Sequence, residues 1–124
     1  MGKGGNKDNE MKYTKFKNKD FKKAIKFELP IYPFGVHFCL LSESREDYLD
    51  NKEARAVRDG QNLYIYFKEG ASFETIVHEL FHLTEFVMEH IGQPLSKSPN
   101  ETWAYLIGFL AEEFFKFYKI KIIK

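Results

Sequence analysis

The sequence predicts an α+β fold in which a small antiparallel or mixed sheet packs against two long helices. Two observations carry this prediction. Alternating apolar residues separated by tight-turn signals run from about residue 24 to residue 68, and two amphipathic segments of helical period follow them. At 124 residues the chain is long enough for one domain with a modest core, and its thirteen phenylalanines predict a core rich in aromatic side chains.

The first twenty residues are predicted to form a disordered basic tail, which leaves residues 21–124 as the single folded domain. The tail is rich in glycine and lysine and has few aliphatic residues. Residues 1–26 carry nine lysines against three acidic residues, a net charge of +6, whereas the rest of the chain carries −5. Lysines alternate with aromatic residues here, as in proteins that bind single-stranded nucleic acid, and a solubilising tail explains the same pattern.

Composition also bears on location and covalent chemistry. Cys39 is the single cysteine of the sequence, which excludes an internal disulfide. The sequence has no apolar run of membrane-spanning length, and its first residues lack the apolar core of a signal peptide. We therefore expect a cytoplasmic protein, in a bacterium or a phage-infected host, without a membrane partner.

The first half of the domain is predicted to be mostly strands. Pro30 and Pro33 separate two apolar stretches, and Asp59-Gly60 is a favoured pair for a tight hairpin turn. The expected elements are strands at 24–29 and 34–41, a short polar helix at 42–51, and a hairpin with strands at 54–58 and 62–68.

A helix is predicted from Ser72, its N-cap, to Gly92, and it contains the HExxH sequence that begins at His78. At about 100° per residue, His78 and His82 lie roughly 40° apart on one face, where one tetrahedral cation can bind both imidazoles. Glu79 points about 100° away from His78, which suits a base that acts on a metal-activated water. An amphipathic helix with an ordinary solvated face explains both histidines without a metal.

A second helix is predicted from residue 99 to about residue 118. Ser98-Pro99-Asn100-Glu101 reads as an N-cap, a proline at the first helical position and a capping glutamate. A glutamate in this role binds backbone N–H groups and needs no metal.

These motifs resemble the gluzincin metallopeptidases, in which HExxH is followed by a glutamate on a neighbouring helix. Here eighteen residues separate His82 from Glu101, and the segment Asn100-Glu101 with Ala104-Tyr105 is similar to the corresponding segment of that group. The order of elements most resembles the small zincin-like metallopeptidases of phages and prophages.

The resemblance implies a minimal zincin core that binds Zn²⁺ through His78, His82 and Glu101, with Glu79 as general base in peptide hydrolysis. It also implies a peptide or protein substrate docked on an edge strand, for which 62–68 is the candidate. Tyr105, one helical turn after Glu101, is predicted to stabilise the oxyanion.

Two other functions stay open. Larger gluzincin peptidases have a further domain that forms the second wall of the cleft, whereas this chain ends nineteen residues after Tyr105. The first alternative is therefore a non-catalytic, zinc-stabilised interaction module, virion-associated or bound to a phage or other protein partner. The second is nucleic-acid binding through the Lys/aromatic tail.

Overall fold

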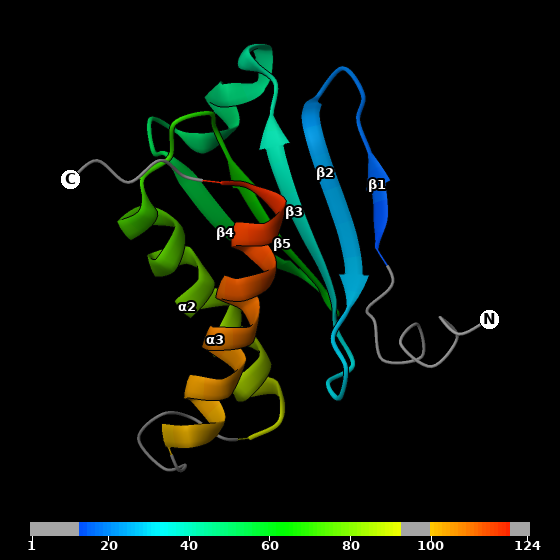
Figure 1. The fold of residues 1–124 in the computed structure, drawn as a ribbon, viewed down its shortest axis with the longest axis vertical. Helices are drawn as coiled ribbons and strands as arrows, with labels where there is room; N and C mark the ends of the chain where they lie inside the picture. The colour runs from blue at the N-terminus through cyan, green and yellow to red at the C-terminus, as the bar shows by residue number, and fades with distance from the viewer. Residues whose placement is uncertain (1–12, 93–99, 120–124) are drawn as a thin grey trace.

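The computed structural model describes residues 13–92 and 100–119, which form an open five-stranded mixed sheet with two long helices on one face (Figure 1). The predicted α+β class is confirmed. No helix in these ranges is both long and apolar enough to cross a membrane. The elements are β1 (Thr14–Phe16), β2 (Phe21–Glu28), β3 (Gly35–Leu41), the 3₁₀ helix η1 (Glu43–Leu49), β4 (Ala54–Asp59), β5 (Asn62–Phe67), α2 (Phe73–His90) and α3 (Asn100–Phe117).

The sheet begins earlier in the chain than the sequence predicted. β1 pairs antiparallel with β2, and the Tyr13 ring meets the Phe27 ring edge-on with 5.6 Å between centroids. Strand pairing and an aromatic contact thus attach residues 13–16 to the sheet, although the many lysines around them predicted a tail. The predicted tail boundary is therefore wrong for residues 13–20, while residues 1–12 lie outside the described residues.

The strand order β1-β2-β3-β5-β4 places β5 inside the sheet. β5 pairs parallel with β3 and antiparallel with β4, so its backbone groups are used on both sides. The prediction that 62–68 is an edge strand open to a substrate is therefore wrong. The predicted hairpin is present, but its first strand, β4, takes the edge.

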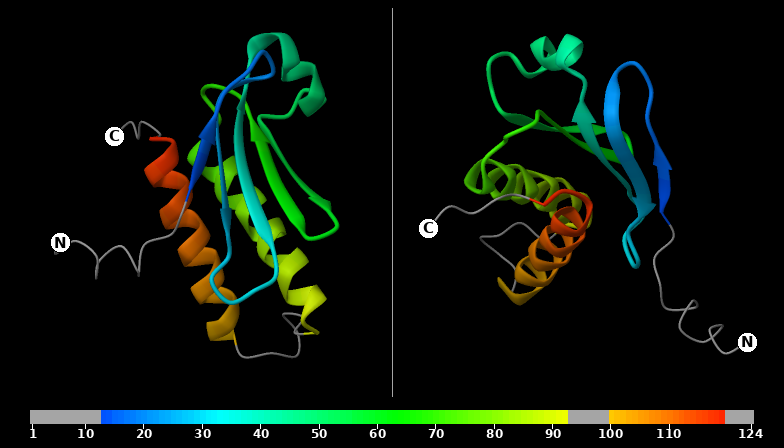
Figure 2. Two further views of the ribbon diagram at one scale, coloured as in Figure 1. Left: turned by 90° about the vertical axis from the view of Figure 1, so that its right-hand side faces the viewer. Right: turned by 45° about the horizontal axis from the view of Figure 1, so that its top comes forward.

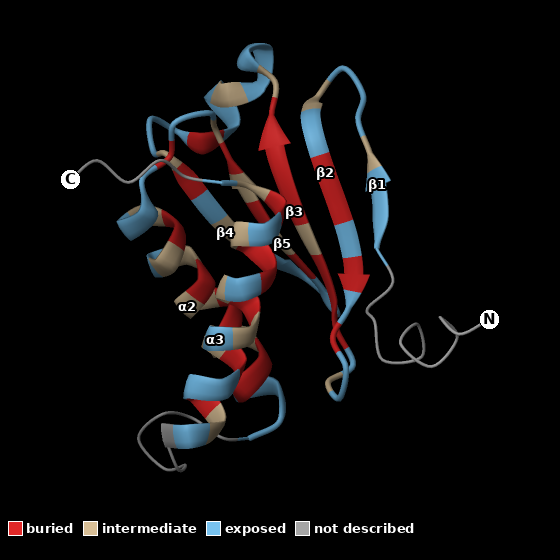
Figure 3. Cartoon of the chain, viewed as in Figure 1, coloured by how far each residue is buried: buried red, intermediate tan, exposed pale blue. Residues whose placement is uncertain are grey.

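The core lies between the sheet and the helix pair (Figure 2). Both helices cover the same face and run in opposite directions, and their inward sides are buried (Figure 3). Phe114 occupies the centre, with its ring centroid 5.0 Å from those of both Phe38 and Phe67. The aromatic core that composition predicts is present; its phenylalanines are Phe27, Phe34, Phe38, Phe67, Phe114 and Phe117.

The outer face of the sheet carries a row of stacked rings instead of a helix. His37 stacks on Tyr64 at 4.3 Å, Tyr64 on Tyr66 at 5.5 Å, and Tyr66 on Phe21 at 6.3 Å between centroids. Burial lowers the pKa of His37, and its ring faces a tyrosine and Asn62, so it is a packed structural histidine. Because each ring in the row uses a face on its neighbour, these rings present mainly edges to solvent.

Candidate metal centre

The start of α2 is fixed by side chains that bind its free N–H groups. Ser72 is the N-cap, as predicted, and its Oγ accepts a hydrogen bond from Thr75 N at 3.1 Å. The Ser72 N–H donates to Glu53 Oε1 at 2.9 Å, and this bond is the main reason that the pKa of Glu53 lies below its ordinary value. Both contacts fix the first turn of the helix that carries the HExxH sequence.

His78 and His82 are brought together on the exposed side of α2. Their Nε2 atoms lie 3.1 Å apart, and their rings are nearly perpendicular, with an interplanar angle of 81°. Two zinc–nitrogen bonds of about 2.0–2.1 Å at a tetrahedral angle need nitrogens roughly 3.3 Å apart. The separation and the facing of the two nitrogens therefore fit one zinc ion.

Glu85 holds the second histidine from behind. Its Oε1 lies 2.7 Å from His82 Nδ1, and both side chains are partly buried. A hydrogen bond from Nδ1–H to this carboxylate would leave Nε2 as the ring nitrogen available towards His78. Histidines that bind metals are usually oriented by such a partner on the other ring nitrogen.

Glu79 lies on the side of α2 that faces the edge strand β4. Its Oε1 accepts a hydrogen bond of 2.9 Å from the backbone N–H of Ala56. Backbone N–H groups along β4 point alternately towards β5 and away from it. The N–H of Ala56 points away from β5, so Glu79 binds an N–H on the outer edge of the sheet. The Glu79 side chain is half-buried there.

Glu101 is not brought to the histidine pair. The α3 helix directs Trp103 towards α2, where its ring lies 5.5 Å from that of Phe81, and Glu101 in the first turn is exposed. In the described ranges, 13–92 and 100–119, no three His, Cys, Asp or Glu side chains converge as a metal site. The ligand role of Glu101 stays a prediction. Ser98 and Pro99, which complete the predicted capping box, lie outside the described residues.

Tyr105 is 78% exposed on the flank of α3 that adjoins the β2–β3 loop. It borders a shallow hollow of about 230 Å³ together with Ile31 and Tyr32 of that loop. The structure therefore shows no contact of Tyr105 with the histidine pair, and its proposed role towards an oxyanion stays a prediction.

Two groups at the site were missed by sequence reasoning. Glu85 follows His82 by three residues, and this helical spacing could have indicated the contact. The N–H of Ala56 gave no sequence signal, because only the strand order places it beside Glu79.

Comparisons with known proteins add no assignment. A scan against protein-family models found no match, and neither did searches of curated proteins and of solved structures. Function must therefore be argued from the site. Two facing imidazoles, an orienting carboxylate and a second carboxylate at a strand edge suit metal-assisted hydrolysis of a carbonyl compound.

Proposed function

We propose that the protein is a zinc-dependent, peptidase-like hydrolase of gluzincin type. The observation that carries the proposal is the 3.1 Å approach of His78 Nε2 and His82 Nε2, with His82 oriented by Glu85. A direct hydrogen bond between the two imidazoles accounts for the 3.1 Å approach without a metal, so the feature that favours a metal site is the carboxylate that orients His82 from its other ring nitrogen.

His78 and His82 would hold the zinc ion, with Glu101 as the proposed third ligand. Trp103 packs on Phe81, so the turn of α3 that carries Glu101 adjoins the turn of α2 that carries His82. Two histidines and one carboxylate leave one position of a tetrahedral zinc site open. When bound, zinc supplies Lewis-acid activation of water and of the substrate carbonyl.

Glu79 is the proposed general base. It takes a proton from the attacking water and delivers it to the leaving amine. Its hydrogen bond to Ala56 N keeps the carboxylate beside the edge of β4. An extended peptide that pairs with the other edge groups of β4, the Ala56 N–H being bound by Glu79, would pass beside Glu79, and peptides are therefore the proposed substrate class.

The first experiment measures zinc in the purified protein after dialysis, by elemental analysis. We expect about one zinc per chain in the wild type, and a loss of bound zinc in His82→Ala because one of two facing ligands is gone. His90→Ala is the matched control, since His90 is an exposed histidine on the same helix. Equal zinc contents in all three proteins, or no zinc in the wild type, would overturn the proposal.

The second experiment tests hydrolysis with a library of quenched fluorescent peptides. Glu79→Gln should keep zinc and lose turnover by about 10²-fold or more, because the amide cannot take the proton. Cleavage by this variant at the wild-type rate contradicts the mechanism. Bound zinc without turnover in the wild type instead supports the non-catalytic, zinc-stabilised module.

A further inference from the structure

Positive charge is concentrated in one part of the described chain. The basic hairpin, defined as residues 13–26, contains β1, the turn and most of β2. It carries six lysines and one acidic residue, a net charge of +5, whereas the other described residues carry seven basic and fifteen acidic side chains, a net charge of −8. The lysines are Lys15, Lys17, Lys19, Lys22, Lys23 and Lys26.

Most of these lysines are not neutralised by the rest of the molecule. Among the described residues, Lys22 makes the one ion pair of the hairpin lysines, with Glu69 at 3.3 Å between Nζ and Oε1. Lys23 donates to the carbonyl oxygen of Phe117 at the C-terminal end of α3. The single acidic residue of the hairpin, Asp20, is paired with Arg45. The hairpin therefore presents an uncompensated positive surface.

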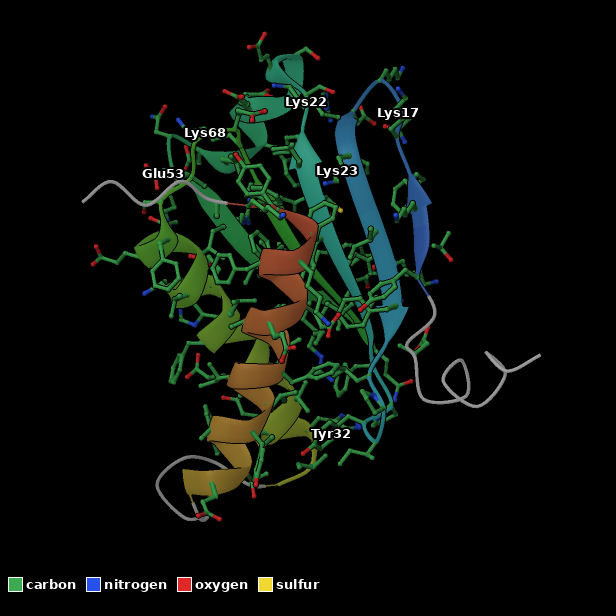
Figure 4. All side chains as sticks on the ribbon, in the orientation of Figure 1. Lys17, Lys22, Lys23, Tyr32, Glu53 and Lys68 are labelled. Carbon is green, nitrogen blue, oxygen red and sulfur yellow. The ribbon has the colours of Figure 1, made fainter. Side chains whose placement is uncertain are left out.

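A hollow of about 260 Å³ lies within this surface. It is lined by Phe16, Ala24 and Ile25 and by four of the hairpin lysines, Lys15, Lys17, Lys22 and Lys23. A register shift between Phe21 and Lys23 interrupts the pairing of β2 with β3, and such a bulge re-aims side chains on the strand. Figure 4 shows Lys17, Lys22 and Lys23 together at the turn end of β1 and β2.

We propose that the basic hairpin binds single-stranded nucleic acid. Its lysines would pair with successive phosphates, and the apolar part of the hollow would receive a base. This surface belongs to the folded sheet and not to residues 1–12, and it does not depend on zinc.

The chemistry of the hairpin favours this partner over a lipid surface. Amphipathic membrane-surface segments combine their charges with exposed apolar side chains that enter the lipid. Tyr13, at 39%, is the only large hydrophobic residue of the hairpin among the prominently exposed ones. The outer face of the sheet is a poorer base-stacking surface, because its ring faces already contact one another.

The test measures binding of the full chain to a fluorescent oligothymidine of about 20 nucleotides by anisotropy. Roughly three to five phosphate contacts predict that affinity falls about ten- to hundredfold between about 50 and 200 mM salt. Lys15→Glu/Lys17→Glu should weaken binding about tenfold or more. The matched control is Lys52→Glu/Arg55→Glu, at and just before the start of β4, the edge strand farthest from β1. It should change the affinity less than about threefold.

Two further measurements complete the test. Lys15→Gln/Lys17→Gln removes charge without reversing it and replaces the first variant if that one fails to fold. Deletion of residues 1–12 should leave the affinity within about threefold. No binding by the wild type, equal losses in the hairpin and control variants, loss on deletion of residues 1–12, or binding to phosphatidylserine vesicles but not to the oligonucleotide would each overturn the proposal.

Discussion

At the scale of single residues, the histidine pair is a product of helix geometry. Side chains four residues apart share a face, so His78 and His82 meet on any helix that contains them. What the helix alone does not supply is ring orientation. Glu85 supplies it, because its carboxylate holds His82 Nδ1 at 2.7 Å and leaves Nε2 towards His78.

This contact gives a prediction for Glu85→Ala. Without the carboxylate the His82 ring loses its fixed tautomer and orientation, and we expect zinc affinity to fall about 10- to 100-fold. The measurement is competition with a chromophoric chelator. Glu89→Ala is the control, because Glu89 is an exposed glutamate on the same helix, and it should bind zinc like the wild type. Equal affinities of the Glu85 and Glu89 variants would show that Glu85 does not position the ring.

At the scale of elements, α2 is anchored at both its start and its flank. Glu53, just before β4, accepts from Ser72 N at the first turn, and Glu79 accepts from Ala56 N on β4. Two carboxylates thus tie the motif helix to one edge strand. These two contacts therefore fix the position of the HExxH side chains relative to the edge of β4.

The Glu53 contact predicts a pH-dependent stability difference. The folded pKa of Glu53 lies below its ordinary value of 4.5, so its stabilising effect is present above that value and is lost as the pH falls through the lowered folded pKa. We expect Glu53→Gln to destabilise the protein by about 0.5 kcal/mol or less at neutral pH, because the amide oxygen still accepts from Ser72 N and only the charge of an exposed group is lost. The difference should close as the pH falls through the lowered folded pKa of Glu53.

Urea unfolding at several pH values measures this difference. Glu43→Gln, an exposed glutamate of η1, is the control and should have a small effect at every pH. A Glu53→Gln effect that is constant down to about pH 3 would show that the carboxylate is not the stabilising group.

At the scale of the whole molecule, the core is an aromatic cluster that joins α3 to the middle of the sheet. Phe114 contacts rings from β3 and β5 and has no exposed surface. Replacing Phe114 by alanine should cost about 3–5 kcal/mol of unfolding free energy, because it removes buried apolar area and leaves a cavity. This is a large share of the roughly 5–15 kcal/mol typical of a domain.

Chemical denaturation of Phe114→Ala tests this prediction. Phe73→Ala is the comparison, because Phe73 is 50% exposed at the start of α2 and should cost much less. Similar losses in the two variants would mean that the core is not centred on Phe114.

Local signals allowed most elements to be predicted. Strand alternation, the hairpin turn and the Ser72 cap each act over a few residues, and all three are present, although the turn consists of Gly60-Gln61 and Asp59 is the last residue of β4. β1 escaped prediction because a three-residue strand among lysines has too short an apolar pattern, and its pairing with β2 gives no signal within the strand itself.

The sequence by itself determined the α+β class, the shared helix face of His78 and His82 and the direction of Glu79, because these follow from the periods of strand and helix. The tertiary structure decided which strand forms the edge, that α3 turns Trp103 and not Glu101 towards α2, and that lysines of the first strands form one surface. Those outcomes depend on contacts between residues distant in the chain. The free energies of the alternative packings differ too little to be read from a local sequence pattern.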